Sequence, residues 1–291
     1  MPRSETQRVD EPRAVTRFAP SPTGHLHLGH AHAALFAWHA TRAAGGRFLL
    51  RIEDIDRGRC TPEFAAAIEE DLTWLELSWE IPARCQSDHM DDYATALGHL
   101  DALGLLYPCF CTRKDIQAEV ARAAQAPHGP DGPLYPGTCR GLDTDTRQAR
   151  QAEGRPFALR LDVARAAQRV GPLTWIDRGR GEVSADPASL GDVVLARKDV
   201  ATSYHLAVTI DDADQGVTLV TRGDDLFHAT HMHRLLQALL DLPVPEWHHH
   251  GLITDAQGTR LAKRADAQTI RALRAAGHSP AEVRAMAGFP D

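Results

Sequence analysis

The first apolar run of the chain is followed by a break and then by apolar positions at helical spacing. Residues 14–18, Ala-Val-Thr-Arg-Phe, suit a buried strand, and residues 19–24, with two prolines and a glycine, end any regular strand pairing. From residue 31 to residue 42 the apolar side of a helix follows. The pattern predicts a strand, a tight loop and a helix, a unit that points unpaired backbone N–H groups at the end of a sheet, where phosphate can bind.

The same kinds of pattern continue along the chain. Strand-like runs cover 47–52, 156–161, 193–195, 204–210 and 217–222, and a short strand is expected after a polar entry at 248–250. Helices are expected at 61–77, with Thr61 as the N-cap, at 91–103 and at 228–240. Residues 117–153 are rich in alanine, arginine and glycine and are expected to be irregular. Charged residues follow three of the strands, those at 47–52, 204–210 and 217–222.

Three carboxylates, Glu53, Asp54 and Asp56, stand where the strand at 47–52 ends. In an open parallel sheet the carboxyl ends of the strands form the edge at which ligands sit. The pattern therefore indicates a binding site, and a solvated acidic turn is the alternative.

His27 and His30 are three residues apart, so on a first helical turn they face the same way. Two imidazoles there can donate hydrogen bonds to phosphoryl oxygens while charge builds on them. Gly29 between them leaves room for a flat ligand to reach the backbone. The chain has 16 histidines, so a metal-binding or merely solvated pair is the alternative.

Five cysteines without an export signal do not favour a disulfide framework. Cys109, Cys111 and Cys139 flank a segment rich in glycine and proline, and three thiolates plus one more ligand would close a tetrahedral structural zinc site. Three unpaired buried cysteines are the alternative reading. Cys60 and Cys85 have no partner at metal spacing.

Composition narrows the class of protein without naming a partner. The 291 residues are 43% hydrophobic and 24% charged, as in an ordinary soluble enzyme with room for two closely joined lobes. The net charge of −7 does not favour a nucleic-acid partner, although a local basic patch would suffice. Residues 1–13 lack the apolar stretch of a signal peptide, and no apolar run reaches membrane-spanning length. We expect a cytoplasmic monomer without a membrane partner.

Several strings of residues resemble the class I aminoacyl-tRNA synthetases. Pro-Ser-Pro-Thr-Gly at 20–24, followed by His-Leu-Gly-His at 27–30, resembles the HIGH signature, and Arg-Phe-Ala at 17–19 is similar to the glutamyl and glutaminyl branch. Residues 50–56 resemble the family's Leu-Arg-Ile-Glu-Asp-Thr-Asp, with Ile55 replacing the threonine. Residues 258–264 resemble the KMSKS motif, with Lys263 at the second lysine, Arg260 at the first and Ala262 replacing the serine. Losing that hydroxyl puts one phosphate or loop contact in doubt.

The resemblance implies an α/β fold: a Rossmann-like parallel-sheet nucleotide-binding domain with a zinc-carrying insertion and a short helical C-terminal tail. The implied divisions are 1–107 and 191–264 for the two halves of the catalytic domain, 108–190 for an acceptor-binding-like insertion, and 265–291 for the tail. It also implies ATP as a substrate, with Mg²⁺, and one structural Zn²⁺ per chain.

The resemblance further implies a role for individual residues. The catalytic residues would be His27, His30 and Lys263. ATP would be bound by His27, Gly29, His30, Arg260 and Lys263. L-glutamate would be bound by Arg17, Phe18, Ala19, Pro20, Ser21, Glu53, Tyr204 and Arg222, with Glu53 holding the α-ammonium. Zinc would be bound by Cys109, Cys111, Tyr135 and Cys139, and His128 is the rival for the fourth position.

Only 28 residues follow Lys263, whereas full glutamyl- and glutaminyl-tRNA synthetases continue into a large anticodon-binding region. The chain thus resembles the glutamyl-Q tRNA(Asp) synthetase family. Its members activate glutamate with ATP and attach it to the queuosine base in the anticodon loop of tRNA(Asp). A basic face for RNA phosphates is expected from Arg260, Lys263, Arg264, Arg271 and Arg274. The alternatives are a truncated enzyme that charges tRNA(Glu) at its 3′ end and a non-catalytic tRNA-binding scaffold.

Overall fold

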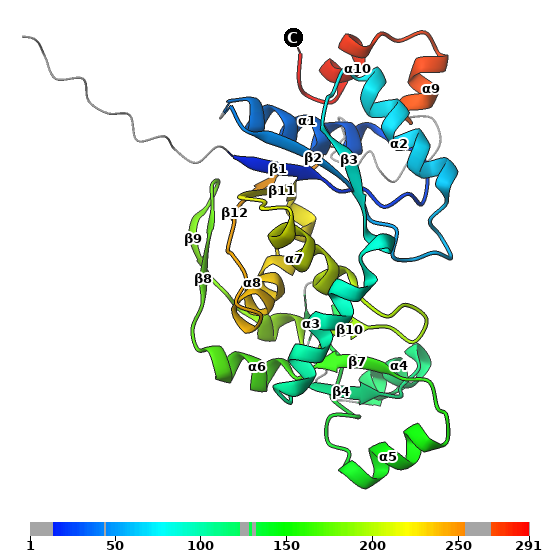
Figure 1. Cartoon of the computed structure of the whole chain (residues 1–291), viewed down its shortest axis with the longest axis vertical. Helices are drawn as coiled ribbons and strands as arrows, with labels where there is room; N and C mark the ends of the chain where they lie inside the picture. Colours follow the sequence, from blue (N-terminus) through cyan, green and yellow to red (C-terminus); the bar gives the residue numbers. More distant parts are fainter. Residues whose placement is uncertain (1–13, 44, 123–127, 130–131, 254–268, 291) are drawn as a thin grey trace, which may run out of the picture.

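The main sheet of the protein is built from two sets of strands that meet at its centre (Figure 1). The computed structural model describes residues 14–43, 45–122, 128–129, 132–253 and 269–290. The first set is parallel and consists of β1 (Val15–Phe18), β2 (Arg47–Ile52) and β3 (Glu80–Cys85). The second set consists of β11 (Leu219–Gly223), β12 (Glu246–His250), β8 (Thr174–Asp177) and β9 (Gly181–Ser184).

Thr218 joins the two sets of strands. Its backbone N–H donates to the carbonyl of Val15 at 3.0 Å, and its hydroxyl accepts from the N–H of Val15 at 2.9 Å. β11, β12 and β8 are mutually parallel, and only β9 runs antiparallel, beside β8. The expected parallel sheet is therefore confirmed, and the carboxyl ends of β1, β2 and β11 lie at one edge.

Helices cover the main sheet and bury its apolar positions. Those of the main body are α1 (Leu28–Ala43), α2 (Pro62–Trp74), α3 (Met90–Ala102), α7 (Tyr204–Asp214) and α8 (Ala229–Leu239), with short 3₁₀ turns at Gln86–Asp88, Pro187–Leu190 and Asp224–Leu226. Of the C-terminal helices, α10 (Pro280–Met286) lies by α1 and α9 (Ile270–Ala275) lies by α2. Ile270 and Val283 are fully buried in the core that Leu35 also enters. Among the described residues, no helix is long and apolar enough to cross a membrane.

A second, smaller sheet lies at the end of the molecule opposite α9 and α10 (Figure 1). Its antiparallel strands, in the order β10-β7-β4, are β10 (Val194–Ala196), β7 (Ala158–Leu161) and β4 (Leu106–Cys109). Around it lie α4 (Arg113–Arg122), α5 (Thr144–Ala152), α6 (Val163–Val170) and the short pair β5 (His128–Gly129) and β6 (Gly132–Pro133). The expected insertion, residues 108–190, includes β8, which belongs to the main sheet. Strand β10 lies beyond that range but pairs with β7 of the smaller sheet.

Three predictions about elements were wrong. Residues 204–210 form the start of helix α7 and not a strand, because an apolar run that is buried on nearly every side gives no periodicity by which to tell helix from strand. Residues 248–250 lie inside β12 and do not precede it. The segment 117–153 is not irregular throughout: it holds the end of α4 and all of α5, which Asp143 caps and which has no buried side chain to reveal its period.

Candidate active site

A cavity of about 620 Å³ opens at the carboxyl ends of β1, β2 and β11. Nine of the predicted site residues line it together: Arg17, Phe18, Ala19, Pro20, Ser21, His30, Glu53, Tyr204 and Arg222. Residues that sequence reasoning did not assign also contribute to the wall, namely Thr23, Gly24, His25, Ala33, Thr221, Gly223 and Leu226. Thr221 and Gly223 flank Arg222 in the sequence, and Thr23, Gly24 and His25 lie in the loop between Ser21 and His27, so position beside predicted residues was the available signal for these five. Arg260 and Lys263 lie outside the described residues.

His27 and His30 cap the start of α1. The Nδ1 of His27 accepts from the N–H of Gly29 at 3.1 Å, and the Nδ1 of His30 accepts from the N–H of His27 at 3.2 Å. Both rings therefore carry their proton on Nε2, and they stack with centroids 3.8 Å apart. Burial lowers the pKa of His27 and, with the nearby His27, lowers the pKa of His30 to about 4. Both imidazoles are thus neutral N–H donors at pH 7.

Gly29 has a closer reason to be glycine than contact with a ligand. A Cβ at this position would lie 3.0 Å from Cε1 of His27 and 3.1 Å from its Nδ1. A larger residue would push the His27 ring away from the N–H of residue 29, which donates to its Nδ1.

Arg17 is buried and its guanidinium is already paired. Its Nε donates to Asp212 at 2.9 Å, and its Nη1 donates to the carbonyl of Thr221 at 3.1 Å. Asp212 also accepts from Arg51 at 2.9 Å. Sequence reasoning gave Asp212 no role, although it stands in a charged run after an apolar one. The fork of Arg17 is thus used inside the protein.

Arg222 is also buried, but it contacts no carboxylate among the described residues. Its Nη1 donates to the hydroxyl of Tyr204 at 3.2 Å. Burial lowers the pKa of Arg222, because the charged form loses solvent. A buried cation without a counter-ion is costly, so a cavity wall that presents one suits an anionic ligand.

Glu53 contributes a carboxyl group to the same cavity. Its N–H donates to the carbonyl of Pro20 at 3.0 Å, which fixes it at the end of β2 beside the loop after β1. Burial raises the pKa of Glu53 to about 7, against the opposing effect of Arg51 and Arg17. The cavity therefore presents both an arginine without a carboxylate partner and a carboxylate, which is the pairing that a zwitterionic ligand with an acidic side chain requires.

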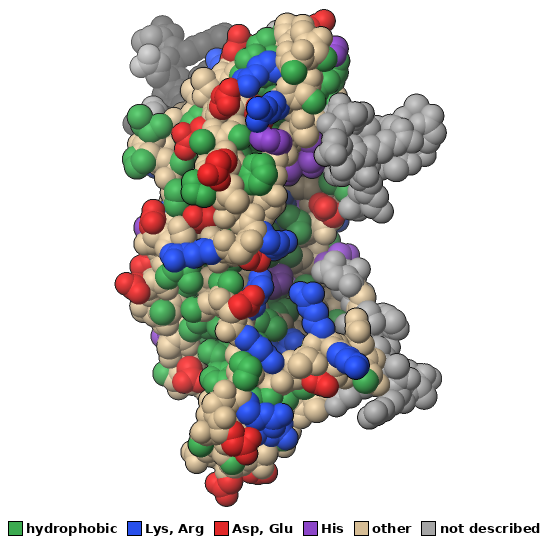
Figure 2. Space-filling model, turned by 90° about the vertical axis from the view of Figure 1, so that its right-hand side faces the viewer, with side chains coloured by type: hydrophobic (Ala, Val, Ile, Leu, Met, Phe, Trp, Pro, Cys, Tyr) green, Lys and Arg blue, Asp and Glu red, His purple; other side chains and the backbone are tan. Residues whose placement is uncertain are grey.

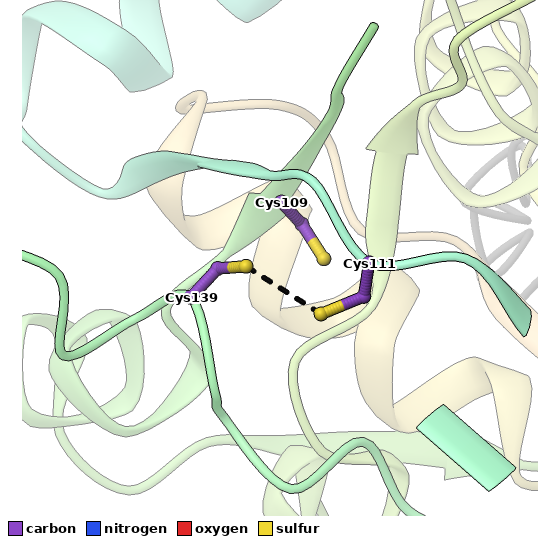
Figure 3. A group of neighbouring side chains, drawn as sticks. All are labelled: Cys109, Cys111 and Cys139. Carbon is purple, nitrogen blue, oxygen red and sulfur yellow. Dashed lines mark hydrogen bonds between the residues drawn. The ribbon is translucent and has the colours of Figure 1, made fainter. Parts of the chain in front are cut away.

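The three cysteines predicted to bind metal converge between β4 and the loop before α5 (Figure 3). Their Sγ atoms lie within 4.8 Å of one another, and those of Cys111 and Cys139 are 3.5 Å apart. The hydroxyl of Tyr135 lies 3.4 Å from Sγ of Cys109 and 3.7 Å from Sγ of Cys111. Donors about 3.7 Å apart are what tetrahedral bonds of roughly 2.3 Å to zinc require. These four residues thus fit a metal ion.

The surroundings of the cysteines also fit a metal site. The N–H of Phe110 donates to Sγ of Cys139 at 3.4 Å, and the N–H of Cys139 donates to the hydroxyl of Tyr135 at 2.9 Å. Such outer bonds orient ligands. The rival ligand, His128, has its backbone in β5, and its side chain lies outside the described part of the chain.

Basic side chains gather on one face of the molecule. Figure 2 shows Lys and Arg in the lower half of this face, where the smaller sheet lies. Exposed basic residues in this part of the chain include Arg113, Lys114, Arg140, Arg155, Arg197 and Lys198. Of the basic face expected near the C-terminus, Arg271 is exposed and Arg274 pairs with Glu70 at 2.6 Å, and the other three residues lie outside the described ranges.

Comparison with known proteins defines the class. A family model described as tRNA synthetases class I (E and Q), catalytic domain, matches residues 13–287. Together with the parallel sheet and the paired histidines at its edge, this match shows that the chain belongs to the class I tRNA synthetases of this branch.

Relatives narrow the class further. A glutamyl-Q tRNA(Asp) synthetase from Rhodobacter capsulatus is 51% identical over 284 residues, which cover 94% of this chain and all of the relative. One from Symbiobacterium thermophilum is 44% identical, over 92% of this chain and 83% of the relative. Within the class, the chain is a member of the glutamyl-Q tRNA(Asp) synthetase family, and it is a ligase.

Solved structures agree on the fold. A glutamate tRNA ligase from Elizabethkingia meningosepticum, crystallised with its amino acid, superposes with a TM-score of 0.71 at 27% identity over 87% of this chain. The corresponding enzyme from Elizabethkingia anophelis gives a TM-score of 0.70 at 29% identity. The chain spans about half the length of these two proteins, 52% and 53%.

Proposed function

We propose that the protein activates L-glutamate with ATP to form glutamyl-adenylate without tRNA, and then transfers glutamate to the queuosine base of tRNA(Asp). The observation that carries the first part is the cavity itself. It sets the buried Arg222, which has no carboxylate partner among the described residues, and the carboxyl of Glu53 in one wall with His30. Glutamate has one ammonium and two carboxylates. In this wall, Glu53 offers a negative charge to the ammonium, and Arg222 offers a positive charge to the side-chain carboxylate.

In the glutamate site, Glu53 and Arg222 would bind different charged groups of the substrate. Glu53 would hold the α-ammonium, since a charge-assisted hydrogen bond contributes about 1.5–3 kcal/mol. Arg222 and Tyr204 would hold the side-chain carboxylate. Arg17, paired with Asp212, would shape the wall with Phe18, Ala19, Pro20 and Ser21 and contribute positive charge, while its fork stays with Asp212.

The adenylate step would rest on neutral donors. An oxygen of the glutamate α-carboxylate attacks the α-phosphorus of ATP, the bond to the bridging oxygen breaks, and pyrophosphate leaves with the electron pair. The Nε2–H groups of His27 and His30, freed by the bonds at Nδ1, would donate to phosphoryl oxygens as charge develops. Lys263 would neutralise the leaving pyrophosphate, and Mg²⁺ bound with ATP would share that charge.

A structural zinc ion would be held by Cys109, Cys111, Tyr135 and Cys139. None of the four lines the cavity, so the ion would stabilise the insertion and take no part in chemistry. When bound, it would fix the loop that carries Tyr135 and Cys139 to the end of β4.

The acceptor would be the anticodon loop of tRNA(Asp). The main support is the 51% identity with a glutamyl-Q tRNA(Asp) synthetase over that protein's whole length. The basic face below the cavity suits an RNA stem, and unstacked loop bases can enter a pocket. The alternative, charging of a tRNA 3′ end, has the support of the two glutamate tRNA ligase structures.

Pyrophosphate exchange tests the activation step. The protein without tRNA should exchange labelled pyrophosphate into ATP when L-glutamate is present, and much less with L-glutamine, because glutamine leaves Arg222 without a counter-ion. Equal rates with both amino acids would contradict the assigned glutamate site. Absence of exchange with every amino acid would favour a non-catalytic tRNA-binding scaffold.

A further inference from the structure

The guanidinium of Arg222 is surrounded by neutral side chains that act as hydrogen-bond acceptors. Its Nε lies 3.2 Å from Nε2 of His249, and its Nη1 lies 3.3 Å from Nδ1 of His233. Its Nη2 donates to the hydroxyl of Thr230. Each of the three guanidinium nitrogens thus has a neutral partner that fixes its orientation, and none of these partners neutralises the positive charge.

The donors and acceptors fix the proton on His249. Arginine can only donate, so Nε2 of His249 is unprotonated where it faces Nε of Arg222. The proton of the neutral ring then lies on Nδ1, which is 2.6 Å from Oδ2 of Asp177. Burial lowers the pKa of His249 to about 4, against the raising effect of Asp177, so the ring is neutral at pH 7.

The fold positions Asp177 to accept the hydrogen bond from Nδ1 of His249. Its side chain and that of His249 are both fully buried. Its Oδ1 accepts from the N–H of Gly179 at 2.8 Å, while its Oδ2 faces His249 and accepts from the backbone N–H at 3.3 Å as well as from the imidazole. Asp177 ends β8 and His249 lies in the neighbouring strand β12, so two segments of the chain 72 residues apart meet behind Arg222.

We infer that Asp177 and His249 are positioning residues for glutamate recognition: Asp177 fixes the tautomer of His249, and His249 orients Arg222 without neutralising it. A carboxylate placed directly on Arg222 would orient it equally well but would compete with the substrate's carboxylate. An imidazole between the two avoids this competition. The inference rests on the proposed role of Arg222 in binding the side chain of glutamate.

Asp177→Asn tests the tautomer directly. The amide keeps the shape of the side chain and can still accept from Gly179, but it presents N–H to Nδ1 of His249. The ring then carries its proton on Nε2, donor against donor with Arg222, as happens when an amide replaces the carboxylate behind other histidines. In pyrophosphate exchange we expect the KM for glutamate to rise by about 10- to 100-fold, with the KM for ATP within about twofold. The preference for glutamate over glutamine should fall as well.

A second variant separates positioning from packing. In His249→Gln, the amide oxygen can accept from Arg222 without help from Asp177, so adding Asp177→Asn to His249→Gln should change the KM for glutamate little further. Glu246→Gln, on the same strand but in an exposed ion pair with Arg178, is the matched control and should leave all constants unchanged.

The outcomes are distinguishable from failure of the proposed function. A wild-type protein with no glutamate-dependent exchange would contradict that function itself. An active wild type with an unchanged KM for glutamate in Asp177→Asn would overturn the inference, as would an equal effect of Asp177→Asn in both backgrounds. An equal rise in the KM values for glutamate and ATP would assign Asp177 a general structural role and would overturn it too.

Discussion

Asp212 holds Arg17 through an ion pair of 2.9 Å, with side chains only 9% and 5% exposed. The two residues are 195 positions apart in the chain, Arg17 in β1 and Asp212 in α7. Asp212 also accepts from Arg51 of β2 at 2.9 Å. One carboxylate therefore joins helix α7, from the second half of the catalytic domain, to strands β1 and β2 of the first half, beside the cavity that Arg17 lines.

Asp212→Asn should destabilise the protein strongly. Burial opposes ionisation of Asp212, yet Arg17 and Arg51 hold its pKa below the usual range. Its replacement would leave the buried Arg17 without its carboxylate partner, while Arg51 would keep Glu53 at 3.6 Å and Asp211 at 3.7 Å. Breaking such a buried pair costs about 3–5 kcal/mol in the free energy of unfolding. Urea unfolding measures this loss. The exposed pair of Arg47 and Glu80 is the control: Glu80→Gln should change stability by less than about 1 kcal/mol. Similar small effects for both variants would show that Asp212 does not hold the halves together.

The pH dependence of glutamate use should report Glu53. Its pKa is raised to about 7 by burial, so below that pH the free enzyme holds a neutral carboxyl that cannot pair with an ammonium. We expect kcat/KM for glutamate to fall about tenfold per pH unit below 7 and to level off above it. His30, with a pKa near 4, does not titrate in this range. A flat profile between about pH 5.5 and 8 would refute the assignment.

Lys263→Ala should slow the adenylate step far more than it weakens glutamate binding. The lysine would act only as negative charge moves onto pyrophosphate, and loss of one such donor costs about 10²–10³ in rate. Exchange kinetics with varied glutamate separate kcat from KM. Lys114→Ala, an exposed lysine on α4, serves as the control. If kcat for Lys263→Ala stays within a few-fold of the wild type, the basic loop does not act as proposed.

Removal of one thiolate should release the metal. Protein purified without chelators should contain about one zinc per chain, and Cys111→Ser should lose it together with thermal stability. Cys60→Ser, outside the cluster, should keep the metal. Tyr135→Phe compared with His128→Ala would identify the fourth ligand. Wild-type protein without stoichiometric metal would exclude the site.

Most of the cavity could be predicted because its residues lie in short strings with a fixed order. The strand at 47–52 was predicted to the residue, and the runs around His27 and Glu53 fall where parallel strands end. The neighbours of Arg17 and Arg222 could not be predicted, because their partners come from distant segments. The sequence around Asp177 or His249 carries no local signal that the two residues meet.

The helix at 204–214 shows a second limit. Its residues are buried on nearly all sides, so hydrophobic periodicity could not separate helix from strand there. Tyr204 nevertheless lines the cavity, at the first residue of α7. The family resemblance implied its place in the site, although the predicted element was wrong.

The acceptor of glutamate can be identified from the position on the tRNA at which labelled glutamate is attached. The protein is given labelled glutamate, ATP and tRNA(Asp), with and without queuosine, and the 3′ end of each tRNA is oxidised with periodate in a parallel set. We expect label to be transferred only to tRNA that contains queuosine. Oxidation of the 3′ end should leave this transfer intact when the diol on the modified base is protected during oxidation and freed again before the reaction. Labelling that requires the 3′ diol and ignores queuosine would instead assign the protein to 3′-end charging.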